Sequence, residues 1–137
     1  MKNIARSVYQ MYKAGGMRRL WHEISESYLF DIVNHTDTHA RVPIQNYSSS
    51  TDKIDSAYQY MPAFTSLILS SIKKIINIDN SVLNSEFIDI GSGKGKALII
   101  ANKLGFVNGT GYEINSDLCE IGNKNLQLVK ASKFKIL

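Results

Sequence analysis

Two acids and a run of alternating glycines are the residues of this chain whose types and spacing could build a ligand site. They are Asp89, Gly91, Gly93, Gly95 and Glu113. Glycine has no Cβ, so a turn that carries three of them can bend sharply and lie against a bound molecule. A carboxylate offers two oxygens that accept hydrogen bonds. The pattern predicts a ligand site between the glycine turn and the second acid.

The elements around these residues predict how they are brought together. Residues 86–90 form a short apolar run typical of a strand that is buried on both faces. Residues 96–104 predict a helix with one broad apolar face, ended by Gly105 in a left-handed conformation. Residues 110–113 close a second strand, with Glu113 at its carboxyl end. A strand, a crossover helix and a parallel strand would place that acid beside the glycine turn, where such sheets bind ligands.

The spacing of the glycines separates the candidate ligands. A dinucleotide fingerprint, G-x-G-x-x-G, fits Gly91 and Gly93 but meets Lys96 at its third position, which disfavours NAD. No register of the segment gives a P-loop. A turn that binds nothing, or another nucleotide whose phosphate meets Lys94 and Lys96, stays open as an alternative. We interpret these two lysines as solvated side chains of the first helical turn.

The remaining pattern, D-x-G-x-G-x-G followed by an acid after the second strand, resembles the first motif of class I S-adenosylmethionine-dependent methyltransferases. The resemblance implies S-adenosyl-L-methionine as the cofactor, with the turn against its methionine and ribose parts and Glu113 accepting from both ribose hydroxyls. Asp89 would fix the turn, and Tyr58 would close over the methionine end. The cofactor-binding residues it implies are Asp89, Gly91, Ser92, Gly93, Gly95, Glu113 and Tyr58.

Two stretches ahead of the turn extend this resemblance. Phe30-Asp31 followed by Asp37-Thr38 is similar to an F-D…D-T element of small bacterial class I methyltransferases. Residues 58–62 are similar to the Y-[EQ]-P-[ST]-P element of the same group, with Tyr60 in place of the first proline. The turn also resembles that of non-SET protein-lysine methyltransferases, so protein lysine is one candidate among unknown acceptors. No catalytic residue is assigned.

The predicted fold is α/β, with N-terminal helices followed by the first half of a Rossmann-like parallel sheet in the order β-α-β-α. We divide the chain into a helical and loop region, 1–57, and a partial cofactor-binding domain, 58–137. A complete fold of this family needs seven strands, whereas the sequence supplies two and the opening of a third at 134–137. We therefore expect a truncated methyltransferase of weak or no activity, completed by a missing carboxyl-terminal half or a partner chain. The alternative is a non-catalytic fragment that binds a nucleotide or S-adenosylmethionine.

The flanking segments carry weaker patterns. Helices are expected at residues 3–13 and 17–30, followed by a polar loop over 31–55. A further helix is expected from Pro62, placed in its first turn, to about residue 76. Ser116 is expected to cap the helix after the second strand.

Composition restricts the setting. The chain has 137 residues, a net charge of +4 and one cysteine, so no internal disulfide can form, which suits the cytoplasm. No apolar run approaches the ~20 residues of a membrane span. Five basic residues and no acid lie in residues 1–20. We interpret them as a solvated helix face, so a nucleic-acid partner is not expected, and His35 and His39 are not expected to bind a metal.

Overall fold

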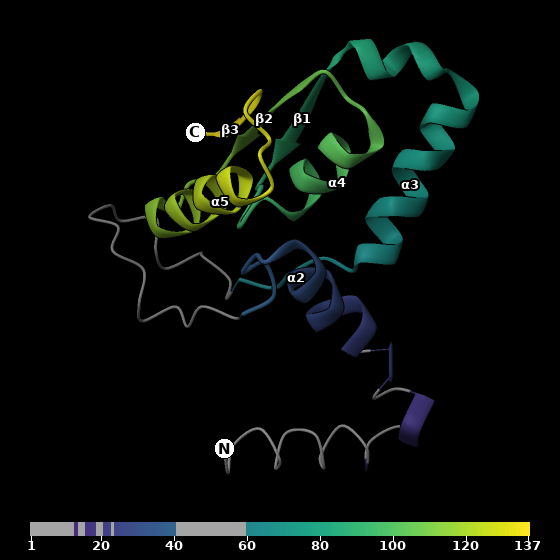
Figure 1. Ribbon diagram of the computed structural model, residues 1–137, viewed down its shortest axis with the longest axis vertical. Helices are drawn as coiled ribbons and strands as arrows, with labels where there is room; N and C mark the ends of the chain where they lie inside the picture. The colour runs from purple at the N-terminus through teal and green to yellow at the C-terminus, as the bar shows by residue number, and fades with distance from the viewer. Residues whose placement is uncertain (1–12, 14–15, 19–20, 23, 41–59) are drawn as a thin grey trace.

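A computed structural model describes residues 13, 16–18, 21–22, 24–40 and 60–137 of the chain (Figure 1). The elements, in chain order, are the π-helix η1 (Ile24–Tyr28), α2 (Leu29–Asn34), α3 (Thr65–Ile78), the 3-10 helix η4 (Asn80–Asn84), β1 (Glu86–Ile90), α4 (Lys96–Leu104), β2 (Asn108–Tyr112), α5 (Ser116–Leu128) and β3 (Phe134–Ile136). The predicted boundary between the two domains lies outside the described residues, as does the helix expected at 3–13 except for its last residue, Lys13, which is helical.

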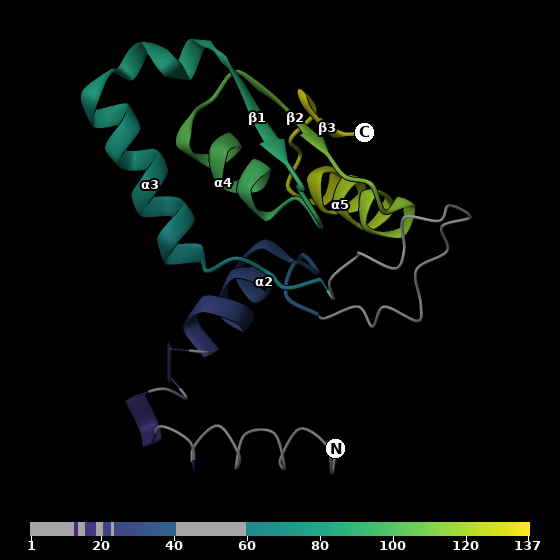
Figure 2. The ribbon, with the colours of Figure 1, turned by 180° about the vertical axis from the view of Figure 1, so that it is seen from behind.

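The three strands form one parallel sheet in the order β1-β2-β3. Each connection between neighbouring strands is a helix, α4 and then α5, and both lead in the same direction across the sheet (Figures 1 and 2). Right-handed crossovers that run in one direction place their helices on one face. This is the arrangement of one half of a doubly wound sheet, so the predicted fold class is confirmed.

The core lies where α4 and α5 pack against the strands. Leu98 and Ile99 are fully enclosed, and each such burial contributes about 1.5–3 kcal/mol. Small residues in β2 let its neighbours approach closely, since a Cβ added at Gly111 would lie 2.5 Å from Ser92 Oγ. The buried apolar side chains of the core are Phe30, Ile72, Leu98, Ile99, Ile100, Ala101, Leu126, Ala131, Phe134 and Ile136.

The prediction that β1 is buried on both faces was wrong. Its burial alternates, and Ile88 and Ile90 are 57% and 78% exposed. The cause is topological, because the two crossover helices cover one face and, within the described part, β1 has a strand neighbour on one side only. An apolar run in the sequence predicts which side chains of a strand can be buried. Whether they are buried depends on the elements that cover each face of the sheet.

Several predicted boundaries also need correction. The second helix continues to Asn34, where the predicted loop had already begun, and ends at His35 in a left-handed conformation with φ of 55°. Pro62 precedes α3, which begins at Thr65 after an extended residue. Asn115, rather than Ser116, caps α5 through its side chain, which accepts from the Leu118 N–H. The third strand is confirmed at 134–136.

Candidate functional site

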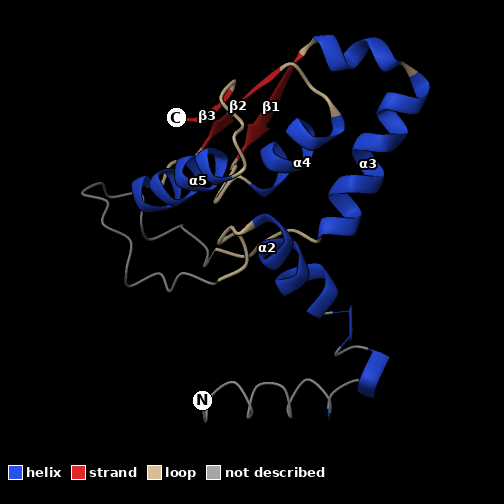
Figure 3. Ribbon diagram, viewed as in Figure 1, coloured by secondary structure: helices blue, strands red, loops and turns tan. Residues whose placement is uncertain are grey.

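The glycine turn joins β1 to α4 at the carboxyl edge of the sheet. Gly91, Gly93 and Gly95 all adopt positive φ angles, of 74°, 51° and 81°. Residues with a Cβ rarely occupy this region, so the three alternating glycines are a conformational requirement of the turn. The described N-terminal segment and α2 lie beyond the same edge of the sheet (Figure 3).

The Glu113 carboxylate lies against the turn. Its Oε2 accepts from the Gly93 N–H at 2.8 Å, and its Oε1 accepts from the Asn115 N–H at 2.9 Å. The predicted proximity of this acid and the glycines is therefore confirmed, as is the parallel pairing of the strands that carry them. One bond to each oxygen leaves further acceptor capacity on both. The Cys119 thiol donates to the Glu113 carbonyl at 3.3 Å, and burial raises the pKa of that thiol.

Every backbone N–H of the turn, from position 91 to position 95, is bonded within the protein. Those of Gly91 and Ser92 donate to the Tyr112 carbonyl at 2.8 and 3.1 Å. The N–H at position 95 donates to the Ser92 carbonyl at 2.9 Å. The remaining two donate to side chains, those of Glu113 and Tyr60. Anion sites built on glycine turns need several N–H groups directed at the ligand, and this turn has none to spare.

Asp89 is a half-buried acid at the end of β1. Burial raises the pKa of its carboxyl, and the nearby charge of Glu113 raises it further. Within the described residues no hydrogen bond joins its side chain to the turn, which is held by the Tyr112 carbonyl. Asp89 therefore contributes an acid beside the site. Among the described residues, no hydrogen bond of its side chain supports its predicted role of fixing the turn.

A shallow hollow opens beside the turn at the carboxyl ends of all three strands. Its volume is about 440 Å³. The lining is mostly apolar, with one carboxylate and one tyrosine, a combination typical of small-molecule sites that use few polar groups for orientation. The lining residues are Ile90, Gly91, Tyr112, Glu113, Ile114 and Leu137.

The two lysines of the turn do not face solvent, so their interpretation as solvated side chains was wrong. Lys94 is 1% exposed, and its Nζ contacts Asp37 Oδ2 at 3.0 Å and the Ala40 carbonyl at 2.9 Å. Lys96 is also buried, with its Nζ 3.3 Å from the Ala63 carbonyl, and burial lowers the pKa of this amine. Neither amine is placed to meet a phosphate in the hollow.

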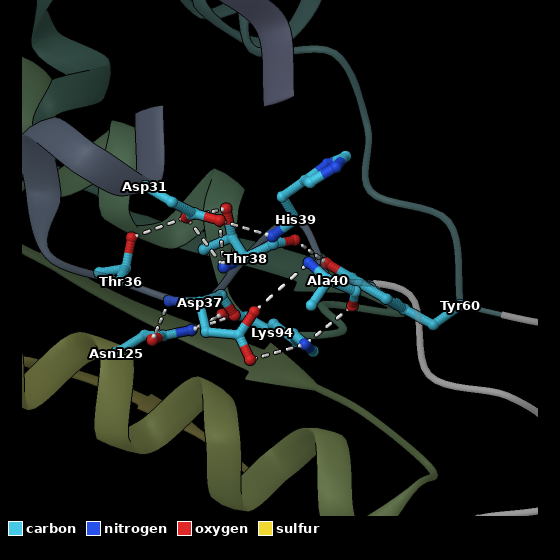
Figure 4. A network of polar contacts seen from close by, with 9 residues as sticks. All are labelled: Asp31, Thr36, Asp37, Thr38, His39, Ala40, Tyr60, Lys94 and Asn125. Carbon is cyan, nitrogen blue, oxygen red and sulfur yellow. Dashed lines mark hydrogen bonds and ion pairs between the residues drawn. The ribbon is translucent and has the colours of Figure 1, made fainter. Parts of the chain in front are cut away.

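The upstream element that begins with Phe30-Asp31 is a polar network docked onto the turn (Figure 4). The Asp31 carboxylate accepts from the N–H and hydroxyl of Thr38, and from the His39 N–H, at 2.7–2.9 Å. This fixes the loop after α2, and the Thr38 carbonyl then accepts from the Tyr60 hydroxyl at 2.8 Å. A weak sequence likeness thus corresponds to a well-bonded loop.

Asn125 on α5 joins the loop to the turn and was not singled out by the sequence. It is 2% exposed. Its amide donates to the carbonyls of Asp37 and Lys94, both at 3.0 Å, and accepts from the Asp37 N–H at 3.0 Å. Both of its partners are distant in sequence. The helical periodicity of α5 could therefore predict that Asn125 faces the protein interior, but not which residues it contacts.

Two other predicted site residues need separate mention. Tyr58 lies outside the described residues, so its predicted contact with the methionine end stays a prediction. Ser92 is buried, and its hydroxyl, which has no hydrogen-bond partner within the described structure, packs against Gly111. Tyr60, which the sequence marked only as a departure from the Y-[EQ]-P-[ST]-P element, lies directly against Gly93.

No protein-family model matches the chain, and no curated protein matches it. Several solved structures resemble its fold, among them the three that follow. An S-adenosylmethionine-dependent methyltransferase from Thiobacillus denitrificans, in complex with S-adenosyl-L-homocysteine, is 21% identical over 61% of this chain and 33% of its own length, with a TM-score of 0.45. A protein from Staphylococcus aureus proposed to be a caffeoyl-CoA O-methyltransferase is 20% identical over 80% of this chain and 48% of its own, with a TM-score of 0.47.

The third, YjhP from E. coli, is 17% identical over 54% of this chain and 29% of its own, with a TM-score of 0.43. The chain thus spans between 29% and 48% of the length of these proteins. We base the functional proposal on the glycine turn and Glu113, and not on the similarity to these structures. Among the described residues, no helix has the length and apolar character needed to cross a membrane, and no group of metal-binding side chains occurs.

Proposed function

We propose that this chain carries the cofactor half-site of an S-adenosyl-L-methionine-dependent methyltransferase. The observation that supports it most is the Glu113 carboxylate, held by two backbone N–H groups beside the glycine turn and facing the hollow. When bound, the cofactor supplies a methyl group on a positively charged sulfur. The protein's task is then to hold that group in line with an acceptor and to keep water away.

The residues present fit such a ligand. Glu113 has acceptor capacity left on both oxygens, which suits two adjacent ribose hydroxyls. Ile114 and Leu137, which are 76% and 57% exposed in the hollow, offer apolar surface for a base. The three glycines bring the backbone of the turn close to whatever lies over it. Asp89, whose raised pKa marks a partly desolvated carboxyl, would face the amino-acid part of the cofactor.

The nucleotide alternative is less well supported by the same geometry. A phosphate needs N–H donors or cations, whereas the amides of residues 91–95 are already bonded and both lysines are directed into the protein. A ligand without phosphates makes no such demand on the turn. The second candidate function is that of a fragment that binds S-adenosylmethionine without catalysis. It would use the same binding site, but the methyl group would not be transferred.

Isothermal titration of the chain with S-adenosylhomocysteine, ATP and NAD tests this proposal. We expect binding of S-adenosylhomocysteine alone. Glu113→Ala should weaken it by roughly 1–3 kcal/mol, the usual cost of losing charge-assisted hydrogen bonds. Glu120→Ala, which removes an exposed acid of α5 away from the hollow, is the matched control. Binding of ATP or NAD without a response to S-adenosylhomocysteine would overturn the assignment.

We further propose that the methyl acceptor, for which protein lysine is one candidate, is met at the edge of β1. Within the described residues this edge has no strand neighbour, and Ile88 and Ile90 lie exposed on the face of β1 that the crossover helices leave uncovered. A parallel strand added there, from this chain or a partner, would end next to the turn at the point where doubly wound sheets reverse their strand order. The chain by itself should therefore bind S-adenosylhomocysteine yet transfer no methyl group to lysine peptides, as a radiolabel assay would show.

A further inference from the structure

We propose that Tyr60 is a positioning residue for the cofactor, because its hydroxyl ties the glycine turn to the loop that follows α2 and its ring walls the turn at Gly93. This inference rests on the proposed function and adds a residue to the same site. The inference gives residues 24–40 a role in holding the glycine turn, in addition to their packing on the sheet domain.

The ring of Tyr60 lies directly on the turn. A Cβ added at Gly93 would be 2.5 Å from Tyr60 Cε2, so only a glycine permits this approach. The Lys94 Nζ is 5.6 Å from the centroid of the same ring, which places a buried cation beside its face. The ring is therefore fixed from two sides by neighbouring residues of the turn.

The hydroxyl of Tyr60 bridges two segments that are distant in sequence. It donates to the Thr38 carbonyl at 2.8 Å (Figure 4). It also accepts from the Lys94 backbone N–H. Burial raises the pKa of this hydroxyl, and the charges of nearby carboxylates raise it further, so it stays protonated and can keep donating. One oxygen thereby satisfies the amide at the centre of the turn and connects it to the loop that is hydrogen-bonded to Asp31.

The charges around the bridge are paired across the same two segments. Asp37 and the Ala40 carbonyl bind the Lys94 amine, while Asn125 binds the Lys94 carbonyl. Lys94 is thus held at its N–H, its C=O and its side chain, and Tyr60 supplies the first of these contacts. Because the Gly93 N–H next to it binds Glu113, any shift of the turn moves the carboxylate proposed to hold the ribose.

Two measurements on the full chain test the inference, with Tyr60→Phe as the variant and Tyr28→Phe, which loses a half-exposed hydroxyl, as its control. Tyr60→Phe keeps the ring and removes the bridge. We expect faster hydrogen exchange of the Lys94 amide by NMR in the ligand-free protein, and S-adenosylhomocysteine binding weakened about tenfold, which equals ~1.4 kcal/mol. Tyr28→Phe should change neither.

The outcomes separate the inference from the proposed function. If unaltered protein fails to bind S-adenosylhomocysteine, the proposed function falls and this inference falls with it. If the unaltered protein and Tyr60→Phe bind equally well, only the inference is overturned. Faster exchange at Lys94 together with unchanged affinity also overturns it, because the bridge would then be structural and not positioning.

Discussion

The pair formed by Lys94 and Asp37 allows the docking of the N-terminal segment to be measured independently of any ligand. The lysine is 1% exposed and the aspartate 53% exposed, at a separation of 3.0 Å. Breaking a fully buried pair costs 3–5 kcal/mol, whereas exposed pairs contribute about 0–1 kcal/mol. Since water reaches only the acid, we expect Asp37→Asn to lower the free energy of unfolding by about 2 kcal/mol, between these limits.

Lys94→Met tests the other half of the pair. The variant keeps most of the apolar stem and removes the buried charge, while Asp37 returns to water and the Ala40 carbonyl loses its donor. We expect a cost of about 1 kcal/mol, the net value of an ordinary hydrogen bond. The double variant should cost about the same as Lys94→Met alone, because without the lysine the acid has no charge to neutralise. The coupling energy is then about 2 kcal/mol.

Urea unfolding followed by circular dichroism measures all four proteins. The control cycle pairs Asp37→Asn with Lys124→Met, an exposed lysine of α5, and should be additive. Raising the salt concentration should change the coupling little, because a buried charge is weakly screened. Additive costs for Asp37→Asn and Lys94→Met, within about 0.5 kcal/mol, would refute the reasoning.

Three further predictions concern single side chains. Gly111→Ala should lower the free energy of unfolding by on the order of 1–3 kcal/mol in urea, since its Cβ would meet Ser92 Oγ at 2.5 Å; an unchanged midpoint would contradict this close packing. Asn125→Ala, which deletes one buried and two partly buried hydrogen bonds, should cost about 3 kcal/mol by the same assay. Burial, and to a lesser extent the charge of Glu113, raises the pKa of the Asp89 carboxyl above its usual value of 3.8. The protonated carboxyl therefore stabilises the fold at low pH, and this stabilisation is lost as the pH rises from 3.8 through the raised pKa. Asp89→Asn should therefore flatten the decline of the melting temperature between pH 4 and 7, and an unchanged decline would contradict the burial of this carboxyl.

Local chemistry explains what the sequence predicted correctly. The positive φ angles of the turn require glycine, the apolar face of 96–104 requires a helix, and a strand–helix–strand unit has one favoured hand, so Glu113 had to arrive beside Gly93. Each of these constraints acts over at most about 25 residues, a range within which a pattern in a single sequence is informative.

The failures have the opposite cause. The burial of Lys94 depends on Asp37 and Asn125, which are 57 and 31 residues away along the chain. The exposure of Ile88 depends on which face the crossover helices cover. Tyr60 was visible only as the wrong residue in a motif. Pairings of this kind arise from tertiary contacts, which residue patterns along a single sequence do not reveal.

The inward direction of both lysines has an electrostatic consequence for the proposed reaction. The electrostatic field at the mouth of the hollow is therefore negative, because it comes from Glu113 and, when ionised, from Asp89. The positive charge of Lys94 is neutralised by Asp37. A positively charged sulfur entering there is attracted, whereas the thioether left after transfer has lost that charge. The spent molecule should therefore be exchanged for a fresh one most readily at low ionic strength, where this preference is least screened.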